Sequence, residues 1–248
     1  MKLLAVDASG RVATVALCDG SGILAEYSVD YNKTHSQTLL PMIDEVLRIT
    51  ETDREALDGI VVSKGPGSFT GLRIGAATVK GLCNALGVKL CGISTLEMLA
   101  GNFLGEKGFV IPLMDARRNQ VYSAIYDCSG REPVSVCEDK ARSIEEITAL
   151  ANGLEGPKVL LGDGLEPNRD YLLGNLTGDF RFAPEHLNLQ RAGSLLMLGK
   201  MAFEKGLFVS GEELEIEYLR MSQAERVRME MAAGAEKNGK EQAEGSHA

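Results

Sequence analysis

The sequence predicts an α/β protein made of two successive units, each built around a mixed sheet. Short apolar stretches typical of strands alternate with longer stretches of helical periodicity, and Gly and Asp residues separate them. The same order of elements begins again near residue 105. The chain has 248 residues, which is long enough for two globular domains. Its contents of 44% hydrophobic and 25% charged residues are ordinary for such domains.

The first unit opens with strands that pair as hairpins. Strands are expected at 2–8, 13–19 and 22–30. Gly and Asp between them supply the turns that antiparallel pairing requires. A helix follows over 34–50, where Thr34 or Ser36 can cap the first turn. Its apolar residues cover more than the roughly 100° stripe that a surface helix needs, which fits either deeper burial within the chain or a partner surface.

The remaining elements alternate between strand and helix. In the first unit we expect strands at 57–64 and 88–94 and helices at 71–86 and 95–103. In the second unit we expect strands around the Asp115–Gln120 turn, a further strand at 133–138, a helix at 143–152, a strand at 158–164 and a helix at 192–206. Because both units begin with a hairpin after an Asp, the pattern indicates duplication at the level of the fold.

The turn Gly65–Gly75, "GPGSFTGLRIG", joins a predicted strand to a predicted helix. It lacks the Lys of a Walker A loop, and its glycines do not have the G-x-G-x-x-G spacing. The helix N-terminus could bind an anion, because its first N–H groups have no partner within the helix. Alternatively, the glycines allow a tight turn and close packing of the helix. The sequence leaves both interpretations open.

Two carboxylates occupy corresponding places in the two units. Asp7 ends the first strand, with Ser9 beside it, and Asp115 repeats that position. Facing carboxylates of this kind could hold hydrated Mg²⁺ and a polyphosphate, although Asp is also common as a simple turn cap. The three histidines have no metal-binding spacing, and Ser68 lies in no nucleophile motif. Apart from the possibility left open at Asp7 and Asp115, we expect neither a metal site nor catalytic residues.

Composition restricts the classes of partner. The formal net charge of −9 argues against stand-alone binding of a nucleic acid backbone, though not against acting on RNA beside a basic partner. The five cysteines are scattered and are expected to be buried free thiols of a cytoplasmic protein. No apolar run reaches the ~18 residues that would span a bilayer, so we expect no membrane association. From Met221 onward the composition predicts a disordered tail.

Several strings together resemble one family. They are "DAS" near the N-terminus, "THSQTLLPMI", "GPGSFTGLRIGAATVKGL", "GISTLE" and "MDARRNQVY". On these motifs the chain resembles the TsaB (YeaZ) family from Met1 to about Tyr126, and "GDG" at Gly162 and "YLR" at Tyr218 extend the match more loosely.

The resemblance implies a two-lobed ASKHA fold, the fold of actin, hsp70 and sugar kinases. Its expected parts are an N-terminal lobe at 1–104 carrying the partner-docking helices, a C-terminal lobe at 105–220 and a disordered tail at 221–248. The helix near 191–205 is a candidate to pack back on the first lobe.

The resemblance also implies a function. It is that of a non-catalytic scaffold or activator in the synthesis of N6-threonylcarbamoyladenosine at position 37 of tRNA. The partners would be the enzyme TsaD and the ATPase TsaE, with tRNA contacted indirectly through the complex. The complex would use ATP, but this chain would turn over no cofactor. Where TsaD has two metal-binding histidines, this chain has Thr95 and Leu99.

Two sets of site residues follow from the resemblance. The docking face, which could also form a homodimer, would lie on the helices 36–49 and 71–86. Its members would be Leu39, Leu40, Ile43, Val46, Leu47, Gly71, Gly75, Thr78 and Leu82. A phosphate cleft inherited from an active ancestor would contain Asp7, Ser9, Gly65, Gly67, Asp115 and Arg118. The alternative function is an ATP-dependent small-molecule kinase or ATPase of the same fold that uses this cleft.

Overall fold

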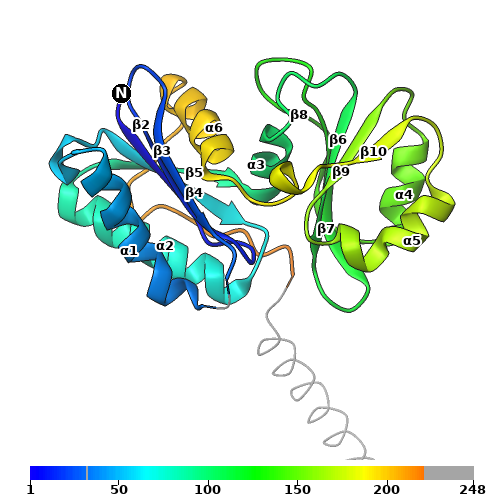
Figure 1. The fold of residues 1–248 in the computed structure, drawn as a ribbon, viewed down its shortest axis with the longest axis horizontal. Helices are drawn as coiled ribbons and strands as arrows, with labels where there is room; N and C mark the ends of the chain where they lie inside the picture. The colour runs from blue at the N-terminus through cyan, green and yellow to red at the C-terminus, as the bar shows by residue number, and fades with distance from the viewer. Residues whose placement is uncertain (32, 221–248) are drawn as a thin grey trace, which may run out of the picture.

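A computed structural model describes residues 1–31 and 33–220 (Figure 1). The predicted disordered tail, 221–248, lies outside the described residues. Two five-stranded sheets form the centres of two lobes, which lie side by side in Figure 1. The α/β class with two mixed sheets is therefore confirmed.

The first sheet has the order β3-β2-β1-β4-β5. Its strands are β1 (Leu3–Asp7), β2 (Ala13–Cys18), β3 (Ile23–Val29), β4 (Gly59–Gly65) and β5 (Lys89–Ser94). The hairpin strands β1, β2 and β3 pair antiparallel, whereas β1, β4 and β5 are parallel. Parallel neighbours need a crossover connection, and the helices between β3 and β5 supply it.

Helices cover both faces of the first sheet. The alternation of β1 shows the division, because Leu4 and Val6 pack under α1 (His35–Ile49) and α2 (Phe69–Leu86), whereas Leu3 and Ala5 pack under α6 (Ala192–Glu204). Although α6 follows the second lobe in the sequence, it packs against the first sheet. The chain therefore crosses between the lobes more than once.

The second sheet has the order β10-β9-β6-β7-β8. Its strands are β6 (Phe109–Asp115), β7 (Gln120–Asp127), β8 (Val134–Ser143), β9 (Lys158–Leu161) and β10 (Phe180–Phe182). Helices α4 (Ile144–Asn152) and α5 (Leu165–Asn175) cover its outer face. On the inner face, α3 (Thr95–Gly101) lies between the two sheets and contacts strands of both.

The segment after α6 returns to the first lobe. Val209 forms a bridge with Leu90, and the Lys80 ammonium donates to the Leu214 carbonyl at 2.8 Å. Near its end, Lys64 and Glu217 form an ion pair with a nitrogen–oxygen distance of 2.5 Å. These contacts carry the chain along α2 toward the junction of the lobes. The sequence gives no sign of this path.

Two elements of the second lobe were also missed. Helix α5 carries Pro167, Gly174 and several polar residues, so its apolar periodicity is weak. Strand β10 has only three residues. The strand predicted at 133–138 is longer than expected and runs to Ser143. The five cysteines are free thiols, as expected, and all but the half-buried Cys137 are buried. Among the described residues no helix has the length and apolar character needed to cross a bilayer.

If α6 packs closely on the first sheet, a larger side chain at its point of contact should destabilise the protein. A Cβ at Gly199 would overlap the side chain of Val61 on β4. Gly199→Val should lower the free energy of unfolding by at least ~1–3 kcal/mol through overpacking, measured by urea denaturation. Lys200→Val is the control on the same helix, where the same residue type enters a less crowded position. Equal stability of the two variants would show that α6 does not pack closely here.

Candidate functional site

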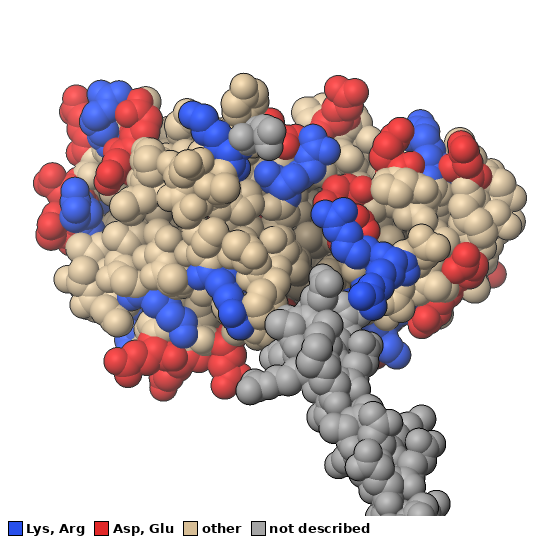
Figure 2. Space-filling model, turned by 90° about the horizontal axis from the view of Figure 1, so that it is seen from below, with Lys and Arg blue, Asp and Glu red and all other residues tan. Residues whose placement is uncertain are grey.

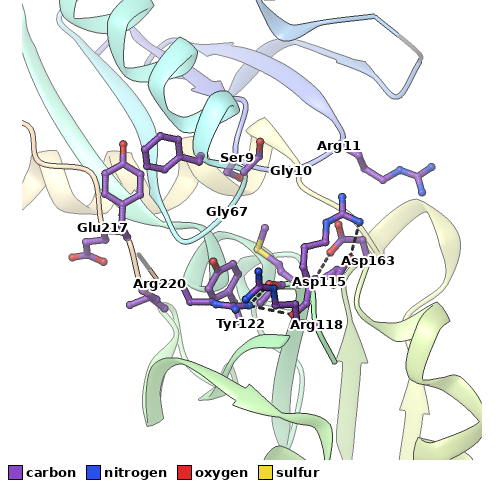
Figure 3. A pocket seen from close by; sticks show the side chains of 17 residues that line it. Ser9, Gly10, Arg11, Gly67, Asp115, Arg118, Tyr122, Asp163, Glu217 and Arg220 are labelled. Carbon is purple, nitrogen blue, oxygen red and sulfur yellow. Dashed lines mark hydrogen bonds and ion pairs between the residues drawn. The ribbon is translucent and has the colours of Figure 1, made fainter. Parts of the chain in front are cut away.

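A cleft of about 500 Å³ lies where the lobes meet (Figure 3). Five segments form it: the β1–β2 hairpin, the β4–α2 turn, the β6–β7 turn with the strand ends beside it, the β9–α5 loop and the C-terminal segment. Its lining residues are Ser9, Gly10, Arg11, Gly67, Ser68, Phe69, Met114, Asp115, Ala116, Arg117, Arg118, Tyr122, Asp163, Glu217, Tyr218, Leu219 and Arg220. Turns from both repeated units therefore face one another across it.

The glycine turn after β4 packs against the β1–β2 hairpin. A Cβ at Gly67 would overlap the Ser9 carbonyl, and one at Gly71 would overlap the Ala8 carbonyl. The Ser68 N–H donates to the Ser9 carbonyl at 2.7 Å, while the Ser68 hydroxyl caps α2 by accepting from the Gly71 N–H at 3.2 Å. These contacts require glycine, and they favour the packing interpretation of the turn.

The β6–β7 turn has an unusual backbone. Arg117, Arg118 and Asn119 have φ of 63°, 55° and 58°, and each residue in such a conformation costs roughly 1–2 kcal/mol. Asp115 holds the turn, since its Oδ1 accepts from the Arg117 N–H at 2.7 Å. Arg220 supports it from the C-terminal segment by donating to the carbonyls of Ala116 and Arg117. The turn thus presents two arginine side chains at the cleft (Figure 3).

Four of the predicted cleft residues line the cleft: Ser9, Gly67, Asp115 and Arg118. Asp7 and Gly65 do not, and this part of the prediction is corrected. Gly65 is buried at the end of β4, where it lies opposite Ser94 of β5 and a Cβ would overlap the Glu217 carbonyl. The prediction failed there because strand pairing continues one step beyond the apparent start of the turn.

Asp7 is fully buried beneath the hairpin. Its Oδ1 accepts from the Ser9 N–H at 3.0 Å and from the Ser63 hydroxyl. Burial raises the pKa of this carboxyl, because the charged form loses its hydration. A buried group of this kind cannot face Asp115 across the cleft to hold a hydrated metal ion. The sequence left open a pair of facing carboxylates, and the structure does not bring Asp7 to the cleft to form one.

The predicted set omits two acidic cleft residues, Asp163 and Glu217, and Asp163 is the one that supports the β6–β7 turn. It follows β9, and its Oδ1 accepts from the Asp115 N–H at 3.0 Å. Burial raises its pKa as well. The only signal in the sequence was the string Gly162–Gly164 after a predicted strand, which gives no indication that the carboxylate supports the β6–β7 turn.

The predicted docking residues divide between core and surface. Leu39, Ile43 and Val46 are at most 2% exposed and pack on the first sheet, so their assignment to a partner surface is wrong. Gly71 and Gly75 face Ala8 inside the lobe, which corrects their assignment too. Most apolar residues of α1 are therefore buried within the first lobe, rather than exposed to a partner.

An outward stripe remains on the helix pair. Leu40 is 50% exposed, and Leu47, Thr78 and Leu82 are half-buried. Together with their neighbours they form what we call the α1–α2 face: Leu40, Leu47, Ile74, Ala77, Thr78, Gly81 and Leu82. Of these, Leu47, Ile74 and Leu82 also pack partly against the core of the lobe. Figure 2, which views the underside of Figure 1, shows a broad area without charged side chains over this lobe.

The two residues that the resemblance aligns with metal-binding histidines of TsaD are interior. Thr95 and Leu99 are both fully buried in α3 between the sheets. Within residues 1–31 and 33–220, no group of three or more His, Cys, Asp or Glu side chains is arranged to hold a metal ion.

The burial of Asp7 predicts a dependence of stability on pH. Because the folded-state pKa is raised, this carboxyl favours folding below its unfolded pKa, and that contribution is lost as pH rises through the folded pKa. Asp7→Asn should therefore gain stability relative to the unmodified chain between pH 4 and pH 7 in urea denaturation. Asp44→Asn, an exposed change on α1, is the control. A stability difference for Asp7→Asn that does not vary with pH would contradict the assigned burial.

Comparisons with known proteins agree with this architecture. Residues 22–219 match the family model described as "TsaD: tRNA N6-adenosine threonylcarbamoyltransferase". The TsaB protein of Bacillus subtilis is 31% identical, over 91% of this chain and 96% of its own length. The TsaB protein of Escherichia coli is 29% identical over 89% and 95%. Both carry the name "tRNA threonylcarbamoyladenosine biosynthesis protein TsaB".

Solved structures give the same result. YeaZ from Pseudomonas aeruginosa is 26% identical with a TM-score of 0.73, covering 88% of this chain and 99% of that one. A second Pseudomonas aeruginosa structure, described as similar to peptidase YeaZ, has 27% identity, a TM-score of 0.76 and the same coverage. The fold of this chain is therefore the two-lobed ASKHA fold that the family resemblance implied. With this extent of match in sequence and in structure, the chain belongs to the TsaB (YeaZ) family.

Proposed function

We propose that this chain is a non-catalytic scaffold subunit in the biosynthesis of tRNA N6-threonylcarbamoyladenosine. It would bind the threonylcarbamoyltransferase TsaD through the α1–α2 face, hold that enzyme in an active form and support recruitment of TsaE. The relatives that match over nearly their whole length carry the name of this pathway. The match to the TsaD family model suggests a partner of similar fold.

The α1–α2 face is the observation that carries this proposal. Its outward residues are apolar or small, whereas a solvated helix pair ordinarily has charged residues in such positions. Small residues let a partner helix approach closely. A free surface of this chemistry would also allow two copies of the chain to pair when the enzyme is absent.

Gly81 adds support. It lies within α2, is exposed, and a Cβ there would meet nothing within 4 Å. Glycine within a helix costs ~1 kcal/mol relative to alanine, and nothing in the packing of residues 1–31 and 33–220 accounts for glycine at this position. Close approach of a partner helix would account for it.

The ATP-using alternative has less support. It required Asp7 and Asp115 to hold a metal–polyphosphate complex between the lobes. Asp7 is buried beneath the hairpin, and one of its oxygens is occupied by Ser9 and Ser63. The glycine turn has its own packing role, and the facing turn presents arginines rather than glycines.

Leu40 provides a direct test of docking. Leu40→Asp places a charge on the α1–α2 face without disturbing the core, so it should abolish co-elution with TsaD in size-exclusion chromatography. Leu173→Asp on α5, which is similarly exposed, is the matched control and should co-elute normally. Thermal unfolding of both variants should stay close to that of the unmodified chain. Normal co-elution of Leu40→Asp would place the docking surface elsewhere.

Gly81 provides a test in which stability and docking move in opposite directions. Gly81→Gln should raise the free energy of unfolding by up to ~1 kcal/mol through better helix propensity, yet weaken TsaD binding at least tenfold by blocking close approach. Gly174→Gln in α5 is matched, because Gly174 is also exposed in a helix with nothing within 4 Å of its Cβ position. Binding constants from calorimetry check both. If the two variants bind TsaD equally well, Gly81 has no docking role.

A further inference from the structure

Basic side chains gather where the lobes meet, on a chain whose net charge is −9. We call Lys33, Arg11, Arg117 and Arg118 the basic rim. Arg117 and Arg118 line the interlobe cleft, Lys33 lines an adjoining cavity of about 530 Å³, and Arg11 lines both. Figure 2 shows Lys and Arg side chains concentrated at this junction, next to the uncharged area of the first lobe.

Carboxylates line the same cavities, namely Asp115, Asp163 and Glu217 in the cleft and Asp30 in the adjoining cavity, but part of the positive charge is available to a ligand. Arg11 pairs with Asp30 at 2.5 Å and Arg117 with Asp115 at 3.2 Å, but both guanidinium groups stay largely exposed. Among residues 1–31 and 33–220, neither Lys33 nor Arg118 forms an ion pair, that is, a nitrogen–oxygen contact to a carboxylate within 4.0 Å. Arg220 does not add to the rim directly. Its guanidinium holds the backbone of the turn that presents Arg117 and Arg118.

Neutral donors accompany the cations. The adjoining cavity lies at the beginning of both α1 and α2, and neither helix has an acidic residue in its first turn. The Thr34 side chain makes no cap hydrogen bond. Hydroxyls of Thr34, Ser68 and Thr70 line the same cavity. Hydroxyl groups and guanidinium forks together suit the oxygens of a phosphate group.

We propose that the basic rim binds the phosphate backbone of RNA, which for the proposed function is the tRNA substrate. Three of the four cations line the interlobe cleft, and Arg11 and Lys33 continue the rim into the adjoining cavity. A rim that extends over two cavities fits successive phosphates of a chain better than a single nucleotide. The rim borders the α1–α2 face, since Ile74 belongs to that face and also lines the adjoining cavity. RNA bound there would lie beside the docked enzyme. This inference rests on the proposed function.

The test measures RNA binding by the assembled complex of this chain and TsaD. Unmodified tRNA is titrated at several salt concentrations for Lys33→Glu and Arg118→Glu. Each variant should weaken binding about threefold to tenfold at low salt and reduce the slope of log affinity against log salt by about 1. Lys140→Glu and Arg131→Glu, exposed changes on and beside β8, are the matched controls and should change neither quantity.

Three other outcomes would each overturn the proposal. If the rim variants bind tRNA as the controls do, the rim does not contact RNA, although the docking role would stand if Leu40→Asp still breaks the complex. If the rim variants fail to co-elute with TsaD, the rim is a protein contact. If they lose binding of ATP in calorimetry but keep tRNA affinity, the ligand is a free nucleotide.

Discussion

The close approach of the β4–α2 turn to the β1–β2 hairpin is the constraint on which the rest of the structure depends. Gly67 and Gly71 bring the turn onto the carbonyls of Ser9 and Ala8, where any side chain would overlap. The Ser68 N–H donates to the Ser9 carbonyl, and the His35 ring nitrogen Nε2 donates to the Gly10 carbonyl at 2.9 Å. The N-terminal ends of α2 and α1 are thus fixed against a single hairpin.

This arrangement has consequences on two sides of the first lobe. On one side, the hairpin and the glycine turn form a wall of the interlobe cleft. On the other side, α1 and α2 are held in parallel contact with their inward residues in the core and a stripe of apolar and small residues facing outward. A turn that resembles a phosphate loop in sequence therefore acts here mainly as a packing element, and the proposed docking face is a result of that packing.

The fold could be predicted largely from sequence because its signals are local. Hairpin turns after Asp7 and Asp115, apolar strands and capped helices all have residue patterns that depend on near neighbours. Helix α5 was missed because Pro167, Gly174 and its polar residues weaken the helical period. The path of 207–220 was missed because its partners, Leu90, Lys80 and Ala116, are distant in sequence.

The site was harder to predict for the same reason. Sequence periodicity shows that α1 has too many apolar residues for a simple surface helix, but it does not show which of them face the sheet. Leu39 and Leu40 are adjacent, yet one is buried and the other is half exposed. Asp7 has the residue type and position of a cleft ligand, and only the three-dimensional path of the hairpin buries it. Asp163 enters the site through β9 pairing beside β6.

The most direct test of the account is an omit-one assay of threonylcarbamoyladenosine formation. TsaD, TsaE, the enzyme that forms threonylcarbamoyl-adenylate, ATP, threonine, bicarbonate and tRNA are combined with and without this chain, and modified adenosine is quantified. The account predicts that product forms only when the chain is present. Equal product without the chain would contradict the scaffold role.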